Sequence, residues 1–347
     1  MMVNKSVSLN HFHNRFSLIK SYIKKDPIVK GFPVSLEVEV TNKCNLRCMT
    51  CPRDFMTRKK GFMSFSLFKK IIKESEKYLE TVLLFHCGEP LLHPQIGDMI
   101  GYAKEKGIKT ILFTNVTLLS EDKAHELLKN QLDMLVMSFD GGDKSSFEDL
   151  RKGAQFESVI HNMVNVLRMK KQYKSKMYTQ IHFVLSKKTR KHIKKFFKII
   201  KPLGVNSIRI KPFFNTGNIG STIGEKVETN SRNTRPCLML WREPVICWDG
   251  TMLPCCVDLI GQKPLGNIKN HTIHEVWNGK EMVNLREKFI KKKVDQEPLC
   301  RNCNAFDIHP MFSFGSIFID DFNIRKLYSI FEKMGSLKLV NFYMINY

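Results

Sequence analysis

The stretch "VSLEVEVTNKCNLRCMTC" (34–51) joins a predicted strand to a group of cysteines. Its first seven residues form a β-rich run that is typical of a strand. The last eight residues, "CNLRCMTC", contain three cysteines: Cys44, Cys48 and Cys51. A closed structural metal site takes four protein ligands, so a set of three leaves one coordination position for another ligand.

The rest of residues 34–215 alternates between short β-rich runs and longer amphipathic runs. The six predicted strands span residues 34–40, 81–87, 109–115, 133–140, 178–185 and 207–214. Predicted helices lie between them, including 66–80 and 156–171, and this alternation predicts a parallel sheet with right-handed crossovers. A complete eightfold barrel takes ~250 residues, so we expect an α/β fold with an open, partial (β/α)6 TIM-like barrel. A doubly wound sheet is the alternative.

Four further segments flank the predicted barrel. Residues 1–33 form an N-terminal extension, and residues 216–236 are polar and rich in Gly, Asn and Thr, which is typical of a linker. Residues 237–310 hold six of the ten cysteines and predict a small cysteine-rich domain. Residues 311–347 form an aromatic-rich tail whose role the sequence does not indicate.

The chain has 347 residues, of which 43% are hydrophobic, and a formal net charge of +23. Much of this charge is lysine on helix-like stretches such as residues 187–201, where a solvated basic face explains it without nucleic acid. The N-terminal residues lack the apolar core of a secretory signal, and no run approaches the ~18 apolar residues of a membrane span. We therefore expect a cytoplasmic protein whose reduced cysteines serve metal or redox chemistry.

Loops at the C-terminal ends of strands carry the reactive groups of parallel α/β barrels. Three thiolates on such a loop can bind three irons of a [4Fe–4S] cluster and leave the fourth iron open, whereas a zinc site would recruit a fourth protein ligand. The C-x3-C-x2-C spacing after a first strand resembles that of the radical S-adenosylmethionine (SAM) enzymes. The resemblance implies that SAM binds the open iron. It also implies that an electron from a donor such as flavodoxin or ferredoxin cleaves SAM to a 5′-deoxyadenosyl radical, which abstracts a hydrogen atom.

Other strand ends match the same family. The run "HCGEP" (86–90) stands where the family carries Gly-Gly-Glu-Pro, with Cys87 in place of the first glycine. The resemblance implies a set of cofactor-binding residues: Gly88, Glu89, Pro90, Asn115 and Ser138. Asp140 is a weaker member of this set, and each polar member also suits a turn or a cap. Cys87 is expected to be a small buried residue, with a role as a cluster ligand as the alternative.

A second group of cysteines follows the predicted linker. The run "WDGTMLPCC" (248–256) predicts a β-hairpin with Asp-Gly at its turn, and "EPLCRNC" (297–303) supplies a C-x2-C pair. These features suit a zinc ribbon, but with "LGNI" (265–268) they resemble the C-terminal SPASM and twitch domains of radical enzymes. The resemblance implies one auxiliary [4Fe–4S] cluster with four ligands: Cys237, Cys255, Cys300 and Cys303. Cys256 is the alternative to Cys255, and Cys247 is expected to pack.

A fully ligated auxiliary cluster cannot bind substrate, so electron transfer is its expected role. It would accept the electron that remains after hydrogen abstraction and deprotonation of a substrate radical. Such a two-electron oxidation requires a base within hydrogen-bond reach of the proton. Relatives place an acidic residue near this hairpin, which makes Asp258 the candidate base, with a turn aspartate as the alternative.

Three functions follow as hypotheses. The first is a radical SAM oxidoreductase that acts on a small molecule such as a sugar, a cyclitol or a related alcohol. The second is a maturase that modifies a ribosomally made peptide, although the 33 residues before the first predicted strand are few for a leader-recognition domain. The third is a zinc-dependent RNA-binding protein, which would use the charge but leaves the cysteine spacing and the Gly-Glu-Pro turn unexplained.

Overall fold

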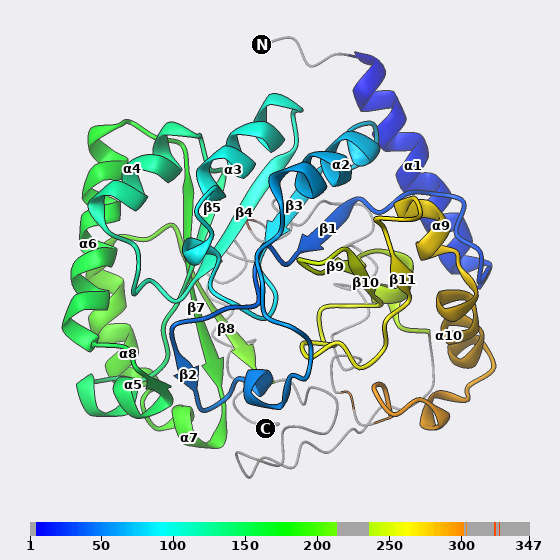
Figure 1. The fold of residues 1–347 in the computed structure, drawn as a ribbon. Helices are drawn as coiled ribbons and strands as arrows, with labels where there is room; N and C mark the ends of the chain where they lie inside the picture. The colour runs from blue at the N-terminus through cyan, green and yellow to red at the C-terminus, as the bar shows by residue number, and fades with distance from the viewer. Residues whose placement is uncertain (1–4, 214–235, 302, 304–322, 324–325, 327–347) are drawn as a thin grey trace.

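The computed structural model describes residues 5–213 and 236–301, together with residues 303, 323 and 326. The predicted linker (216–236) and tail (311–347) therefore lie almost entirely outside the described residues. The described part contains a nine-stranded sheet in the order β11-β10-β9-β1-β3-β4-β5-β7-β8 (Figure 1). Within this part, no helix combines the length and the apolar character that crossing a membrane requires.

Six parallel strands form the barrel wall and follow one another in chain order. They are β1 (Ser35–Val38), β3 (Thr81–Leu84), β4 (Lys109–Thr114), β5 (Met134–Ser138), β7 (Tyr178–Leu185) and β8 (Ser207–Pro212). Each strand pairs in parallel with the next, with Ser35 opposite Thr81 at the start of β1 and β3. A doubly wound sheet reverses its strand order at a switch point. The unbroken order therefore excludes that alternative and confirms the partial barrel.

Helices cover the outer side of these strands (Figure 1). They are α2 (Phe65–Ser75), α3 (Ile96–Glu105), α4 (Glu121–Lys129), α5 (Lys144–Leu150), α6 (Phe156–Gln172), α7 (Lys187–Arg190) and α8 (Ile193–Ile200). The predicted helical stretch at 187–201 is two helices, with a break at Lys191 and His192. Phe196 and Ile200 on the apolar side of α8 are buried, as the amphipathic pattern predicts.

An N-terminal helix and several shorter elements complete the described chain. They are α1 (Lys5–Ile23), β2 (Arg47–Cys48), β6 (Arg151–Lys152), α9 (Ile273–Trp277), α10 (Lys280–Ile290) and five 3-10 helices, η1 (Pro52–Phe55), η2 (Pro90–Leu92), η3 (Lys201–Leu203), η5 (Leu238–Trp241) and η6 (Val294–Gln296). The strand β2 pairs antiparallel with β6, so two loops at the barrel mouth form a small ribbon. The sequence did not predict this ribbon, because strands of two residues carry no periodic signal.

Apolar side chains dominate both faces of the central strands, whereas β1 carries a buried charge and β7 carries the buried polar residues Gln180 and His182. Leu36 and Val38 face the layer of helices, and a separate inner cluster between the strands contains Ile111 and Val136. Side chains alternate along a strand, so Glu37 lies on the inner face of β1, where it is fully buried. The barrel interior therefore carries a charge beside the strand from which the cysteine loop leaves.

The predicted hairpin continues the barrel sheet. β9 (Val245–Ile246) and β10 (Thr251–Leu253) pair antiparallel, and β11 (Gly266–Asn267) adds a third strand. The turn contains Gly250 with a φ of +88°, which favours glycine. β9 also pairs in parallel with β1, with Val245 opposite Glu37. The cysteine-rich region is therefore joined to the barrel by backbone hydrogen bonds and is not a detached domain.

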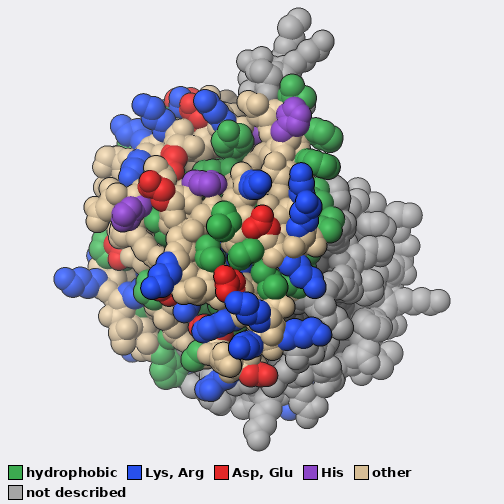
Figure 2. Space-filling model, turned by 90° about the vertical axis from the view of Figure 1, so that its right-hand side faces the viewer, with side chains coloured by type: hydrophobic (Ala, Val, Ile, Leu, Met, Phe, Trp, Pro, Cys, Tyr) green, Lys and Arg blue, Asp and Glu red, His purple; other side chains and the backbone are tan. Residues whose placement is uncertain are grey.

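Figure 2 shows the face of the molecule that carries α1, α9 and α10. Lysine and arginine side chains are spread over this face and alternate with acidic and apolar side chains. A nucleic-acid interface gathers its basic residues on one stripe or patch, and this face shows no such gathering among the described residues.

Candidate metal centres

The first three cysteines lie on the loop that follows β1, at the C-terminal ends of the barrel strands. Cys48 lies in β2 opposite Arg151 of β6, and the N–H of Cys51 donates to Cys48 O (3.1 Å). Burial raises the pKa of the Cys48 thiol to about 11, and the nearby Cys51 and Cys44 thiols add to this rise. The structure therefore brings the three predicted cysteines together.

Two side chains from neighbouring segments hold the backbone of this loop. Arg53 is buried and donates to Cys44 O (3.1 Å) and to Leu46 O. Asn115, directly after β4, donates to Asn45 Oδ1 (3.0 Å) and lies 3.8 Å from Cys44 Sγ. The sequence predicted Asn115 at this site but missed Arg53, which stands in an unpatterned segment.

The turn after β3 packs directly against the start of the cysteine loop. A Cβ atom on Gly88 would lie 2.2 Å from Thr41 O, so glycine is required at this close approach. The N–H of Glu89 donates to Lys43 O (2.9 Å), and Pro90 begins η2. The predicted Gly-Glu-Pro segment thus forms part of the wall beneath the three cysteines.

The Glu89 carboxylate ties the ends of β3 and β4 together. It is 1% exposed, and it accepts hydrogen bonds from Thr114 Oγ1 (2.8 Å) and from the N–H of Asn115 (2.7 Å). Burial raises the pKa of Glu89 to about 7, because desolvation of the charged form outweighs these hydrogen bonds. The carboxylate is therefore poised to change charge near neutral pH.

An ion pair that the sequence did not predict lies beside Cys48. Arg151 Nη2 donates to Asp140 Oδ2 (2.6 Å), and Asp140 Oδ1 accepts the N–H of Val184 (2.7 Å). Both charged side chains are buried, and Arg151 Nε has no hydrogen-bond partner among the described residues. The guanidinium acts electrostatically on Cys48 and Cys44. Its positive charge would stabilise the thiolate forms of these cysteines. Arg151 reaches this position through the pairing of β6 with β2.

Two other predicted positions lie at the same end of the barrel. Ser138 is the last residue of β5 and is partly buried. Cys87 is buried, as predicted, and its thiol hydrogen-bonds to Cys51, which lowers the pKa of Cys51 to about 7. Cys87 therefore touches one of the three cysteines, and a role as a ligand stays an alternative prediction.

The second cysteine group gathers four thiols from three segments. Cys237 precedes η5, Cys255 follows β10, and the N–H of Cys303 donates to Cys300 O (3.1 Å) in the last turn. Burial first, and then other members of the group, raise the pKa of Cys237 to about 12 and also raise the pKa values of Cys255 and Cys300. The four cysteines that the resemblance implied as ligands therefore lie near enough to act on one another electrostatically.

Cys256 and Cys247 lie outside this group of four. Burial raises the pKa of Cys256, and the charged groups that act on it next include Glu37 and Glu243, but only Cys255 among the four thiols. Cys247 is fully buried and packs in a small cluster with Val245, as predicted. Cys255 as the fourth ligand of the second group, with Cys256 as the alternative, stays a prediction.

Asp258 has the environment of a turn residue. It is 1% exposed, and its two carboxylate oxygens accept the N–H groups of Gln262 (2.7 Å) and Lys263 (2.9 Å). A carboxylate engaged in this way closes a loop. This is the alternative that the sequence left open, and the role of Asp258 as a base stays a prediction.

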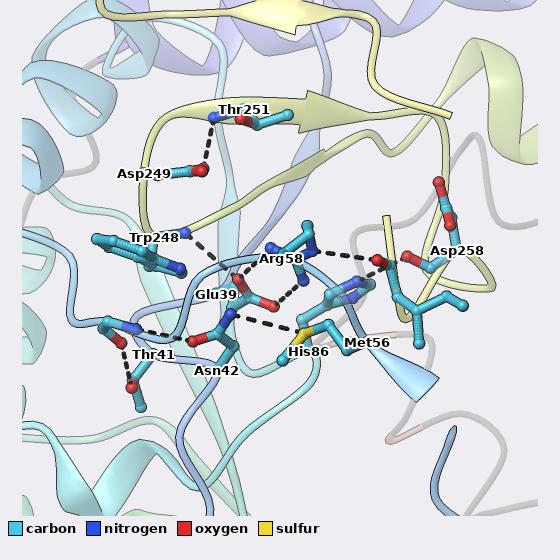
Figure 3. Close-up of polar contacts among 12 residues, drawn as sticks. Glu39, Thr41, Asn42, Met56, Arg58, His86, Trp248, Asp249, Thr251 and Asp258 are labelled. Carbon is cyan, nitrogen blue, oxygen red and sulfur yellow. Dashed lines mark hydrogen bonds and ion pairs between the residues drawn. The ribbon is translucent and has the colours of Figure 1, made fainter. Parts of the chain in front are cut away.

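An ion pair between the partly buried Arg58 and the buried Glu39 connects the first cysteine loop with the hairpin region (Figure 3). Arg58 donates Nη1–H and Nη2–H to the two carboxylate oxygens of Glu39 at 3.0 and 2.8 Å. It also donates Nε–H to Ile260 O (3.3 Å) in the loop after Cys255. Such bidentate pairs combine strength with a defined geometry.

A second pair, which is buried, makes a parallel connection. His86 donates Nδ1–H to Glu37 Oε1 (2.5 Å) and Nε2–H to Asp258 O (3.1 Å). Burial lowers the pKa of His86, but the hydrogen bond and the charge of Glu37 outweigh it, so the pKa is raised. We call the four side chains of these two pairs the clasp: Glu37, Glu39, Arg58 and His86. The sequence offered no signal for the clasp, because its members come from three separate segments.

Two family descriptions match the chain. Residues 38–206 match the radical SAM superfamily, and residues 237–304 match the iron–sulfur cluster-binding domain SPASM. The tungsten-containing aldehyde ferredoxin oxidoreductase cofactor-modifying protein of Pyrococcus furiosus is 24% identical over 322 residues, which cover 78% of this chain and 87% of the relative. The S-adenosyl-L-methionine-dependent 2-deoxy-scyllo-inosamine dehydrogenase of Niallia circulans is 23% identical over 281 residues, which cover 79% and 93%.

A solved structure has the same fold. Streptococcus suis SuiB bound to the precursor peptide SuiA superposes with a TM-score of 0.61 at 15% sequence identity, covering 81% of this chain and 72% of SuiB. The three-cysteine loop after β1, the Gly-Glu-Pro turn after β3 and the four-cysteine region agree with the matched families. The chain therefore belongs to the radical SAM superfamily, whose [4Fe–4S] cluster and SAM it uses, and carries a C-terminal SPASM-type domain for an auxiliary iron–sulfur cluster.

Proposed function

We propose that this radical SAM enzyme oxidises a small molecule, such as a sugar, a cyclitol or a related alcohol, by two electrons. The observation that carries the proposal is that the chain has two groups of thiols. One group has three thiols, which leaves one iron of a cluster without a protein ligand, and the other has four. Both donor sets consist of thiols only, which fits iron–sulfur clusters. The first cluster with its SAM would supply a radical that removes one hydrogen atom from the substrate.

The residues at the barrel mouth would bind and orient the cofactor. Gly88 keeps the turn after β3 close to the cysteine loop, and Glu89 in its ionised form offers a carboxylate to the methionyl amine. Asn115 and Ser138 supply polar groups at the next two strand ends. Arg151 would offset the negative charge near Cys48, because a buried cation stabilises nearby anions strongly at low dielectric.

The second cysteine group would accept the other electron. Four thiols fill every ligand position of a [4Fe–4S] cluster, which leaves electron transfer as its role. The clasp supports this coupling, since Arg58 and His86 hold the loop after Cys255 beside the mouth of the barrel. The substrate proton requires a base, for which Asp258 stays the proposed residue.

The relatives support two substrate classes. The Niallia circulans relative is named a dehydrogenase and covers 79% of this chain, which favours a small hydroxylated substrate. The PqqA peptide cyclase of Gluconobacter oxydans is 22% identical over 306 residues, which cover 78% of this chain, and it keeps a peptide maturase as the second candidate. The zinc-dependent RNA-binding alternative has less support, because it does not account for the match of residues 38–206 to the radical SAM superfamily.

Counting iron and sulfide under anaerobic conditions tests the cluster assignment. We expect about eight irons per chain, falling to about four when Cys44, Cys48 and Cys51 are all replaced by alanine. Wild-type protein with a reductant such as flavodoxin or ferredoxin should cleave SAM to 5′-deoxyadenosine. Zinc without iron in the wild type would overturn the enzyme assignment.

The substrate class is tested by the transfer of deuterium. Candidate sugars, cyclitols and alcohols carrying deuterium on the carbinol carbon should deliver it to 5′-deoxyadenosine and become ketones. Transfer only from a peptide substrate would favour the maturase instead. We also propose a cytoplasmic location, because the cysteines must stay reduced to bind the clusters.

A further inference from the structure

Two positive side chains stand opposite each other on the β2–β6 ribbon, next to the first cysteine group. Arg47 and Lys152 are register partners in this antiparallel pair. Like charges directly opposite each other on paired strands are destabilising. Both side chains are exposed, and neither forms an ion pair with another described residue. The stability of the ribbon therefore does not explain why both positions are basic.

One face of the ribbon carries Cys48 of the first cysteine group, and the other face is exposed to solvent. Because side chains alternate along a strand, Cys48 and Arg151 lie on one face of the ribbon, and Arg47 and Lys152 lie on the other. Cys48 packs against the hydrophobic core, and Arg151 is 8% exposed. The thickness of one strand therefore lies between the candidate cluster ligand Cys48 and the exposed basic pair.

Neighbouring segments extend this basic face. Lys188, in α7, is exposed and its Nζ lies 3.0 Å from Sδ of Met49, the residue after Cys48. Lys191, directly after α7, is also exposed. β2 lies beside α5 and α7 at this end of the barrel (Figure 1). Two exposed carboxylates, Asp54 and Asp149, stand in adjoining segments of the chain.

We propose that the outer face of the β2–β6 ribbon is the docking surface for an acidic one-electron carrier protein. The inference rests on the proposed function, because each cleavage of SAM consumes one electron that must reach the first cluster. In this step the carrier loses one electron and the cluster gains it, and no proton or bond is transferred. Basic residues around the point of entry steer an acidic partner and orient it over Cys48. Attraction of the acidic carrier thus explains why Arg47 and Lys152 are both basic despite their mutual repulsion.

A charge-reversal experiment tests the docking surface. The variant Arg47→Glu/Lys152→Glu is compared with Lys73→Glu/Lys129→Glu, which makes the same change of charge at exposed positions on α2 and α4. The rate of 5′-deoxyadenosine formation is measured with a reduced flavodoxin and with dithionite. With flavodoxin at low salt, we expect the ribbon variant to be about 10- to 100-fold slower than wild type, and the control to change little. With dithionite, all three proteins should react equally fast.

A variant without charge at the two ribbon positions separates the loss of attraction from the introduction of repulsion toward an acidic carrier. Arg47→Gln/Lys152→Gln removes the repulsion, so it should keep its iron and fall between wild type and the reversed variant with flavodoxin. An equal loss in the control variant would overturn the docking surface. An equal loss with dithionite would assign the ribbon to cluster binding or substrate binding instead. Wild-type protein that cleaves no SAM with either reductant would contradict the proposed function and not the docking surface.

Discussion

The two cysteine groups differ in how far the protein encloses them. Cys51 of the first group is exposed and its two companions are partly buried, whereas in the second group Cys255 and Cys300 are buried and the other two cysteines are partly buried. The first group supplies three thiols from one loop, and the second supplies four thiols from three segments of the chain. An open group suits a cluster that binds a cofactor, and a closed group suits one that only stores an electron.

The two groups are nevertheless linked by buried charges. The strand β1 leads into the first group, pairs with β9 of the hairpin, and carries both carboxylates of the clasp on or directly after it. Arg58 and His86 reach from those carboxylates to backbone carbonyls beside Cys255. Removing one partner from a buried pair is costly. The clasp therefore fixes the loop after Cys255 in position beside β1, which leads into the first group.

The largest expected effect belongs to the open group. Cys48→Ala should reduce SAM cleavage by more than about 10³-fold, because a cluster without one of its three thiol ligands no longer presents an open iron in place. The loss is measured as 5′-deoxyadenosine formed with dithionite, alongside iron content, which should fall by about half. Undiminished SAM cleavage would show that Cys48 is not a ligand of the first cluster. The assignment of an open group of three thiols would then be wrong.

Replacing a ligand of the closed group should separate SAM cleavage from substrate oxidation. Cys300→Ala should lose about four irons and all oxidised product but keep SAM cleavage within about threefold of wild type. Cys256→Ala is the matched control, since Cys256 lies outside the group of four. Loss of iron in the Cys256 variant, with full iron in Cys255→Ala, would reverse our choice of the hairpin ligand.

The clasp should stabilise the fold in a pH-dependent way. The pKa of His86 is raised in the folded protein, so its contribution is complete below the ordinary pKa of histidine and is lost as pH rises through the raised value. His86→Gln should lower the free energy of unfolding by about 2 kcal/mol at about pH 6, the size of a hydrogen bond to a charged group. Denaturant titrations of both proteins should show this difference shrinking as the pH rises above the ordinary pKa of histidine. A difference that stays constant across that range would exclude the ion pair as its cause.

The smallest expected effect concerns cofactor binding at the open group. Burial raises the pKa of Glu89 to about 7, so the carboxylate that would meet the methionyl amine is mostly neutral below this pH and ionised above it. The ratio of wild-type to Glu89→Gln affinity for SAM should therefore rise about tenfold from about pH 6 to about pH 8. Equilibrium binding to both proteins measures this ratio, which also cancels the titration of SAM itself. A ratio that does not change with pH would show that Glu89 does not bind the methionyl amine.

The sequence predicted the barrel well because each strand and helix carries its own periodic signal. The six β-rich runs between residues 34 and 214 all contain strands of the sheet. Two features escaped this reasoning for physical reasons. The stretch 187–201 looked like one helix because its lysines are helix formers on both sides of the break. The pairing of β9 with β1 was not predicted because it joins residues that lie some 200 positions apart in the sequence.

The parts of the site also differ in whether a local sequence pattern or a long-range contact determines them. Cys44, Cys48 and Cys51 lie within eight residues, so the covalent chain alone keeps them near one another, and their spacing was readable in the sequence. The ion pair of Arg151 with Asp140, the clasp and the approach of Cys255 to Cys237 depend on which distant segments meet. Such meetings are decided by burial and by long-range strand pairing, which leave no local pattern. The sequence by itself thus determined the cofactor chemistry, and the tertiary structure decided how the charges and the second cysteine group are arranged around it.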